Sequence, residues 1–198
     1  KVKVNLMNLG VDMYSVSAHK VHAPRGVGGL YIRKGVRINP LILGGGQEKG
    51  LRSATENLAG IVAFSKILEK YDKMFNENVE KRKVVLDYLR QKISESMPEH
   101  IIVSPENSPH ILMLALKGVR GEVMLHSLED YGILIGVGSA CSSKKGINKF
   151  QSLLSLDDEH KEGIIRVSVS ETNTIEECDF FLEKLKYLTD KLTDYKRI

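Results

Sequence analysis

The chain reads Ser15-Val16-Ser17-Ala18-His19-Lys20-Val21-His22-Ala23-Pro24-Arg25-Gly26-Val27-Gly28-Gly29, and this stretch decides how the rest is interpreted. Lys20 ends a short β-like run, directly after a hydroxyl and an imidazole, and the chain then turns through a proline and several glycines. A surface lysine is a poor nucleophile, so covalent chemistry needs a partly desolvated or cation-flanked amine. His19, His22 and Arg25 could supply that setting for a Schiff-base lysine. The alternative is an ordinary solvated lysine beside a turn that only changes the chain's direction.

The composition places limits on the class of protein. The 198 residues suffice for one large or two modest domains, and 42% hydrophobic with 27% charged residues is typical of soluble globular proteins. The net charge of +4 comes from basic residues scattered among acidic ones, which does not favour a nucleic-acid surface. Cys141 and Cys178 have no paired spacing, which argues against a disulfide framework or zinc site and favours the cytoplasm. No apolar run reaches the roughly 18 residues of a membrane span.

Hydrophobic periodicity predicts the elements. Strands are expected over 12–17 and 29–33, a loop over 37–50, a helix from the capping box Ser53-Ala-Thr-Glu56, and a helix over 76–95. Further along we expect strands over 101–104, 111–116, 133–135 and 164–170, a helix over 122–131, and a helix from the capping box Thr174-Ile-Glu-Glu177. The second half therefore reads as an α+β unit with an antiparallel sheet, in which 111–116 is a central strand.

The two cysteines have different surroundings. Cys141 lies among small residues, and Lys144 and Lys145 follow closely, which favours the thiolate form that a nucleophilic or sulfur-carrying cysteine needs. An incidental cysteine in a surface loop is the alternative. Cys178 falls on the apolar stripe of a predicted helix, which indicates a structural role.

Arg166 is a third candidate because it lies on the polar side of an otherwise apolar strand. An arginine there can hold a substrate carboxylate by a bidentate pair, although an exposed strand residue or an ion pair would give the same pattern. The remaining histidines share no spacing, so we interpret them as structural or surface groups and not as metal ligands; they are His100, His110, His126 and His160.

Several short motifs follow one another along the chain: Ser17-Ala-His-Lys20 with its Pro-basic-Gly turn, Gly44-Gly-Gly-Gln-Glu48, Arg52-Ser-Ala-Thr-Glu-Asn57, Ser108-Pro-His110, Gly121-Glu-Val123, Gly138-Ser-Ala-Cys-Ser-Ser143 and Ile165-Arg-Val-Ser168 with Asn173-Thr174. Each alone is unspecific. In this order and spacing, over essentially the whole chain, they resemble the pyridoxal-phosphate-dependent cysteine desulfurases. The form of the stretch around Cys141 resembles the long-loop branch of that family.

The resemblance implies an α/β fold of the fold-type I pyridoxal-phosphate-dependent transferases. Residues 1–71 would be the end of the large cofactor-binding domain, and residues 72–198 a small α+β C-terminal domain with an antiparallel sheet. The chain would then be the C-terminal half of one subunit of a cytoplasmic homodimer.

The resemblance also implies roles for site residues. Lys20 would form the Schiff base with pyridoxal 5'-phosphate, while Ser17 and His19 would bind its phosphate. Thr55 would reach the phosphate bound by the neighbouring subunit, and Arg166 would hold the carboxylate of L-cysteine.

The implied activity is the conversion of L-cysteine to L-alanine. Cys141 would attack the substrate sulfur as a thiolate and carry it as a persulfide to an acceptor protein for iron–sulfur cluster assembly or tRNA thiolation. No membrane, metal or direct nucleic-acid partner is implied. A related aminotransferase or lyase is disfavoured because those enzymes do not need the Gly-Ser-Ala-Cys141 motif.

Some features depart from the family. In relatives, residues that contact the cofactor ring precede the lysine, so this chain alone is expected to bind cofactor poorly and to be inactive. A non-catalytic dimerisation module, or a docking module for a sulfur acceptor, is therefore the second hypothesis. Gly136-Val137 stand where relatives usually carry hydroxyl residues, and Ala54 replaces the usual glycine, but neither change removes a catalytic group.

Overall fold

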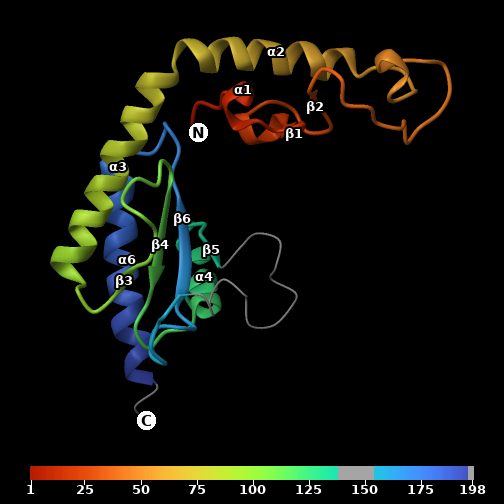
Figure 1. Cartoon of the computed structure of the whole chain (residues 1–198). Helices are drawn as coiled ribbons and strands as arrows, with labels where there is room; N and C mark the ends of the chain where they lie inside the picture. Colours follow the sequence, from red (N-terminus) through yellow and green to blue (C-terminus); the bar gives the residue numbers. More distant parts are fainter. Residues whose placement is uncertain (138–153, 196–198) are drawn as a thin grey trace. The chain divides into compact units, whose positions relative to one another are not determined.

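The computed structural model describes residues 1–137 and 154–195 (Figure 1). It divides into two compact units, one of residues 2–75 and the other of residues 76–198 together with Lys1. The assignment of residues 1–71 to a cofactor domain and of 72–198 to a small domain stays a prediction.

The unit of residues 2–75 is built around a hairpin that carries the lysine turn. Its elements are α1 (Leu6–Leu9), β1 (Met13–Ser17), the 3-10 turn η1 (Ala18–Val21), β2 (Gly28–Ile32), the 3-10 turn η2 (Glu48–Gly50) and α2 (Leu58–Lys73). The two strands expected over 12–17 and 29–33 are present, and the structure shows that β1 and β2 pair antiparallel with Ser17 opposite Gly28. A side chain at Gly28 would overlap the carbonyl oxygen of Val16, so this close approach of the two strands requires glycine.

The predicted start of the first long helix is wrong. α2 begins after Asn57, whose side-chain oxygen accepts a hydrogen bond from the Gly60 amide at 3.1 Å. Ser53, expected to be the cap, is 6% exposed and its hydroxyl accepts a hydrogen bond from the Gly46 amide at 3.4 Å. The Ser53 hydroxyl is therefore used to fold the preceding glycine-rich loop, and Asn57 provides the cap instead.

The unit of residues 76–198 contains a four-stranded sheet. Its elements are α3 (Phe75–Ser96), β3 (Ile101–Ile102), β4 (Ile111–Ala115), α4 (Gly121–Glu129), β5 (Gly136–Val137), β6 (Ile164–Ser168) and α6 (Ile175–Tyr195). The strand order is β3-β4-β6-β5 and every pairing is antiparallel, which confirms the expected α+β architecture with β4 inside the sheet. The strand predicted over 133–135 is wrong, because Ile133 and Ile135 pack against the core by their side chains without joining the sheet.

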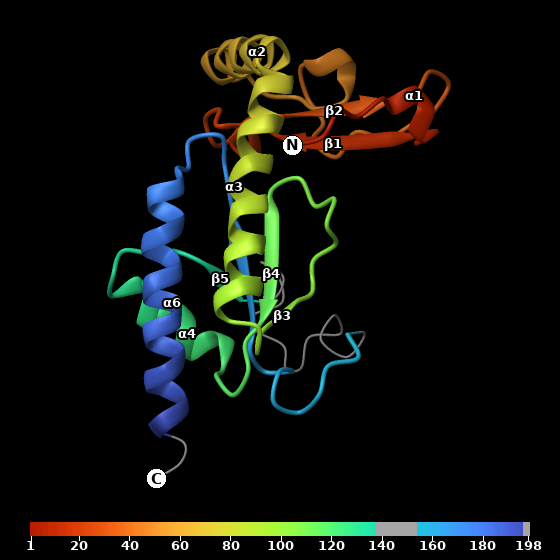
Figure 2. The same ribbon diagram turned by 90° about the vertical axis from the view of Figure 1, so that its left-hand side faces the viewer.

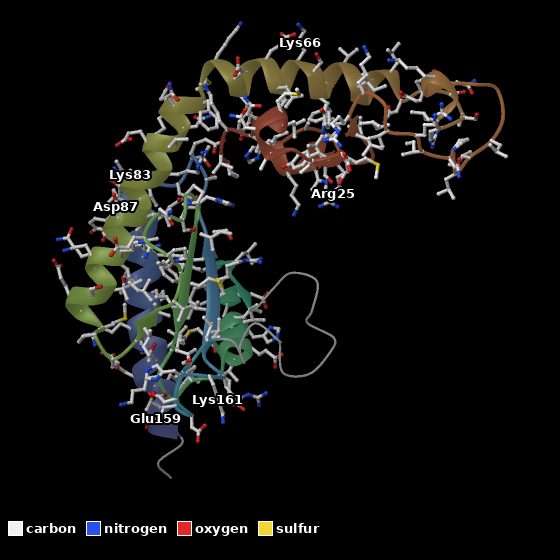
Figure 3. The ribbon with its side chains drawn as sticks, viewed as in Figure 1. Arg25, Lys66, Lys83, Asp87, Glu159 and Lys161 are labelled. Carbon is white, nitrogen blue, oxygen red and sulfur yellow. The ribbon has the colours of Figure 1, made fainter. Side chains whose placement is uncertain are left out.

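Two long helices cover one face of this sheet. Both views show α3 and α6 on the same side of β4 and β6 (Figures 1 and 2). Leu112, Leu114 and Ile165 are fully buried on that face, in one apolar cluster with side chains of α3 and α6. The charged residues Lys83 and Asp87 point away from the cluster (Figure 3). The helical stripe and the strand alternation therefore meet in a single core.

The capping box predicted for the last helix is confirmed. The Thr174 hydroxyl accepts a hydrogen bond from the Glu177 amide at 3.3 Å, and the Glu177 carboxylate accepts one from the Thr174 amide at 3.2 Å. Cys178, in the next turn, is 5% exposed, and burial is the main cause that raises the pKa of its thiol to about 11. The thiol is therefore protonated at neutral pH, as suits a structural cysteine.

Candidate active site

Lys20 lies on a turn whose backbone is held by buried alanines and by hydrogen bonds. Ala18 is fully buried, and its amide donates a hydrogen bond to the Val27 carbonyl at 3.2 Å. The Ala23 amide donates to the Ala18 carbonyl, also at 3.2 Å, and Ala23 is buried as well. η1 lies against α2. The small buried residues on either side of Lys20 therefore fix the backbone while the lysine side chain stays exposed.

A hydroxyl and an imidazole precede the lysine on the same turn. Ser17 has the extended backbone of a helix cap, with φ of −109° and ψ of 122°, but its hydroxyl makes no capping hydrogen bond. Ser17, His19 and Lys20 are all exposed. The turn thus presents a hydroxyl, an imidazole and an amine within four consecutive residues, and the Ser17 hydroxyl is not used to stabilise the turn itself.

Residues 2–75 provide only part of the partly desolvated or cation-flanked surroundings that were predicted for the Lys20 amine. His22 ends η1 in the left-handed region, with φ of 63°, and its ring stacks on Tyr71 with 5.9 Å between centroids and an interplanar angle of 19°. Because Lys20 is exposed within residues 2–75, these residues alone do not supply the desolvation that covalent chemistry at the amine needs.

Thr55, the third residue predicted to contact a phosphate, follows an unusual backbone position. Ala54 has a φ of 140°, and its amide donates a hydrogen bond to the Gln47 side-chain oxygen at 3.4 Å. Thr55 itself is exposed. The Gly-Gly-Gly-Gln-Glu48 motif and the Thr55 motif are therefore tied to each other through Gln47.

Arg166 lies on the sheet face that α3 and α6 leave uncovered. In the sheet it stands opposite Met113 of β4 and Gly136 of β5, whereas its neighbour Ile165 faces the core. Its Nε is buried, and no described residue accepts a hydrogen bond from it. A buried guanidinium nitrogen without a partner is costly, and an incoming carboxylate would satisfy it.

The structure groups some predicted residues and not others. Ser17, His19 and Lys20 share one turn, and Thr55 belongs to the same unit. Arg166 belongs to the other unit, and Cys141 lies outside the described residues. Sequence reasoning missed the contact between Gly136 and Arg166, because the pairing register of two strands far apart in the sequence leaves no local signal.

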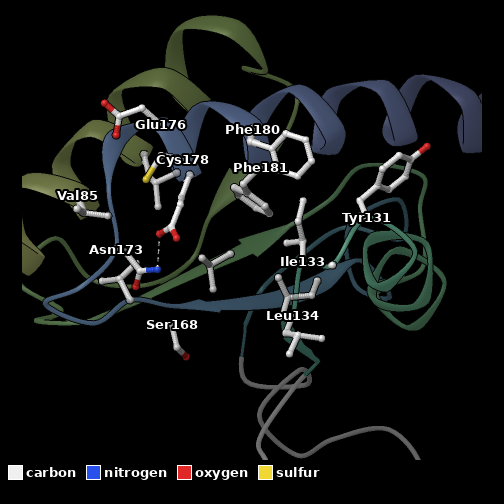
Figure 4. A pocket seen from close by; sticks show the side chains of 16 residues that line it. Val85, Tyr131, Ile133, Leu134, Ser168, Asn173, Glu176, Cys178, Phe180 and Phe181 are labelled. Atoms are coloured by element: carbon white, nitrogen blue, oxygen red, sulfur yellow. Dashed lines mark hydrogen bonds between the residues drawn. The ribbon is translucent and has the colours of Figure 1, made fainter.

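A pocket of about 520 Å³ opens between α6 and residues 131–135 (Figure 4). Its lining is mainly apolar, and at one end the side-chain Nδ2 of Asn173 donates a hydrogen bond to the Glu177 carboxylate at 2.9 Å. Val167 and Val169 line it, whereas Arg166 does not. Since Val167 and Val169 share the helix-covered side of β6, the pocket lies mainly on that side, and the Arg166 side chain is not among its lining.

The described residues show neither a cluster of metal-ligating side chains nor a helix that could span a membrane. Within residues 1–137 and 154–195, no group of three or more His, Cys, Asp or Glu side chains is placed to hold a metal ion. In the same part of the chain, no helix combines the length and the apolar character that crossing a bilayer requires.

The lysine turn fits the phosphate-bearing aldehyde that the motifs imply. A phosphate ester needs hydrogen-bond donors and positive charge, and an aldehyde needs an amine for a covalent link. The Ser17 hydroxyl, which makes no capping bond, and the exposed His19 ring can provide donors. The Lys20 amine lies on the same turn, so these residues fit pyridoxal phosphate.

The chain is similar to known proteins over most of its length. The family model described as Aminotransferase class-V matches residues 1–181. The "NifS/IcsS protein homolog" of Lactobacillus delbrueckii subsp. bulgaricus is 44% identical over 181 residues, which are 87% of this chain and 46% of that protein. The "Cysteine desulfurase IscS" of Dictyoglomus turgidum is 34% identical over 194 residues, or 96% of this chain and 49% of that protein.

Solved structures agree in fold. A NifS-like protein superposes with a TM-score of 0.84 at 34% identity, covering 96% of this chain and 50% of that one. A NifS-like protein from Rickettsia africae gives a TM-score of 0.82 at 26% identity, with the same shares covered. The chain thus spans about half the length of the relatives it matches.

Proposed function

The chain belongs to the class-V aminotransferase family and has the fold of the NifS-like enzymes, and from this premise we propose that it is part of a cysteine desulfurase. The proposed enzyme converts L-cysteine to L-alanine as a cytoplasmic homodimer with pyridoxal phosphate. The observation that carries the proposal is the Ser17–Lys20 turn, whose backbone is anchored by buried alanines while its hydroxyl, imidazole and amine are exposed.

Each proposed role follows from a property of the residue. Ser17 and His19 hold the cofactor phosphate by hydrogen bonds from one side of the turn, and Thr55 does so for the neighbouring subunit. Pyridoxal phosphate, when bound, supplies an electron sink for the bond-breaking at the substrate α-carbon. The Lys20 amine takes up and returns protons near that carbon, because its position is fixed by the turn. Arg166 binds the substrate carboxylate and so orients the amino acid.

Sulfur transfer is assigned to Cys141. Its thiolate attacks the sulfur of L-cysteine, so that a sulfur–sulfur bond forms while the carbon–sulfur bond of the substrate breaks. The electron pair of the broken bond stays with the carbon fragment, which takes up a proton and leaves as alanine. The persulfide on Cys141 then passes its outer sulfur to an acceptor protein of iron–sulfur cluster assembly or tRNA thiolation.

The test compares variants of the cofactor-loaded enzyme. Lys20→Ala is expected to abolish the visible absorbance of bound pyridoxal phosphate, whereas Lys34→Ala, an exposed lysine of the same unit, should keep it. Cys141→Ser should keep the absorbance but form no persulfide. Normal sulfur release by Cys141→Ser would remove Cys141 from the mechanism, and an unchanged spectrum for Lys20→Ala would refute the cofactor site.

The second candidate, a non-catalytic dimerisation or docking module, is favoured by one observation. Leu41 and Leu43 are 94% and 79% exposed, and Ile42 between them is 44% exposed. Three consecutive exposed aliphatic residues are typical of an interaction surface. Adding pyridoxal phosphate and borohydride to this chain tests the module: stoichiometric fixation at Lys20 would rule out a non-catalytic module, whereas an absence of fixation is expected under both candidates.

A further inference from the structure

The side chain of Arg166 bends over a position that has no side chain. Gly136 and Arg166 are direct partners in the β5–β6 ladder, so their side-chain positions face the same way. A Cβ placed on Gly136 would lie 2.9 Å from Arg166 Nη2, 3.3 Å from Cζ and 3.4 Å from Nε. The guanidinium therefore lies across the backbone of β5, which is the edge strand of the sheet.

On the basis of the proposed function, we propose that Gly136 is a positioning residue for the substrate carboxylate, because its bare backbone is the surface on which the Arg166 guanidinium rests. Met113, the partner of Arg166 on the other side, belongs to β4 and has a side chain of its own. The space over Gly136 is what allows the guanidinium to lie toward β5.

The contact matters because the guanidinium has an unmet hydrogen-bonding need. Arg166 Nε is buried and has no acceptor among the described residues. A carboxylate that binds Nε and a terminal nitrogen together would form a bidentate pair, and the geometry of that pair depends on the plane of the guanidinium. The surface of β5 at Gly136 therefore sets where the carboxylate binds.

A methyl group at Gly136 would move the guanidinium without harming the fold. Cβ atoms essentially never come within 3.0 Å of a heavy atom outside their own and the adjoining residues, so the Arg166 side chain would have to shift. The atoms that must move belong to the end of a flexible side chain and not to the backbone, and alanine suits a strand at least as well as glycine. The substitution is therefore expected to change substrate binding and to leave thermal stability unchanged.

The test uses Gly136→Ala, Arg166→Gln and the double variant in the cofactor-loaded enzyme. KM for L-cysteine is measured, together with the calorimetric Kd for the product L-alanine and the thermal midpoint. We expect KM and Kd to rise about tenfold for Gly136→Ala with kcat nearly unchanged, since misplacing a positioning group by a fraction of an ångström to one ångström has effects of that order. Arg166→Gln should raise both by about a hundredfold.

The double variant decides whether Gly136 acts through Arg166. We expect it to equal Arg166→Gln alone, while Met113→Leu, which changes the other neighbour, should match the parent in KM and Kd. An unchanged KM for Gly136→Ala, or an additive effect in the double variant, would overturn this inference only. An unchanged KM for Arg166→Gln would instead overturn the proposed role of Arg166 itself.

Discussion

At the scale of single residues, Ala54 shows how one side chain can be at odds with its backbone. Its φ of 140° lies in a region that L-residues rarely adopt and that glycine adopts freely. The surrounding loop imposes this conformation, since the neighbouring Ser53 amide bonds to the Ile42 carbonyl at 3.1 Å and the Ala54 amide bonds to Gln47. The alanine therefore carries strain directly before Thr55.

Replacing Ala54 with glycine is expected to stabilise the protein. Relief of the strained φ should raise the free energy of unfolding by about 1 kcal/mol, measured by urea denaturation. Ala63→Gly, inside α2, is the matched control and should lower the same quantity by about 1 kcal/mol, because glycine is unfavourable within a helix. Destabilisation of equal size by both substitutions would show that Ala54 is not strained.

At the scale of elements, the turn of residues 157–163 depends on a histidine with two acceptors. His160 Nδ1 lies 2.6 Å from the Asp157 carboxylate, and its Nε2 lies 2.9 Å from the Glu99 carbonyl oxygen. Because neither partner can donate, both ring nitrogens must carry a proton. His160 is therefore an imidazolium that joins this turn to the residues between α3 and β3.

The charge of His160 has a consequence for stability. Burial lowers the pKa of His160, but the hydrogen bonds to Glu99 and Asp157 and the charge of Asp157 outweigh it, so the pKa lies above its ordinary value. A raised pKa gives stabilisation that is complete below the unfolded value of about 6.5 and is lost as the pH rises through the folded value. The nearby His100 has the opposite shift, since burial lowers its pKa.

Comparing His160→Gln with the parent protein across pH tests this assignment. The parent should exceed the variant in free energy of unfolding by a constant amount between about pH 5 and pH 6.5, and by progressively less at higher pH. His126→Gln is the control, because His126 has one carboxylate partner at 2.9 Å but a side chain that is 75% exposed. A parent advantage that grows with rising pH would refute the imidazolium.

At the scale of the whole molecule, a buried ion pair joins segments far apart in the sequence. Arg82 of α3 is 1% exposed, and its Nη1 lies 3.2 Å from the carboxylate of Glu171 in the connection between β6 and α6. Arg82 Nη2 also donates to the Lys1 carbonyl at 3.3 Å, and Lys1 Nζ lies 3.8 Å from Glu171. Removing one partner would leave a charge buried without compensation.

The cost of breaking this pair can be measured by a double-mutant cycle. Glu171→Gln should lower the free energy of unfolding by about 3 kcal/mol, and Arg82→Met with Glu171→Gln should cost less than the sum of the single changes. Asp158→Asn breaks an exposed pair with Lys161 and should cost well under about 1 kcal/mol. Additive single costs would mean that Arg82 and Glu171 are not coupled.

The success of sequence reasoning varied with the range of the interactions involved. The two strands beside the lysine turn, the helix of α3 and the capping box at Thr174 were all predicted, because each depends on neighbours a few residues apart. The start of α2 was not, because packing of the Ser53 loop uses the hydroxyl that the local pattern assigned to a cap. The strand expected over 133–135 failed because apolar side chains can fill a core without joining a sheet.

By itself, the sequence determined which residue types the proposed chemistry can use: an amine at Lys20, a thiol at Cys141 and a guanidinium at Arg166. It also determined the alternation that turns Arg166 away from the core, because strand side chains alternate by covalent geometry. Only the tertiary structure decided that Gly136 lies beneath the guanidinium and that Glu171 meets Arg82. Contacts of this kind depend on strand register and on side-chain burial, which arise when distant segments pack and leave no periodic trace in the chain.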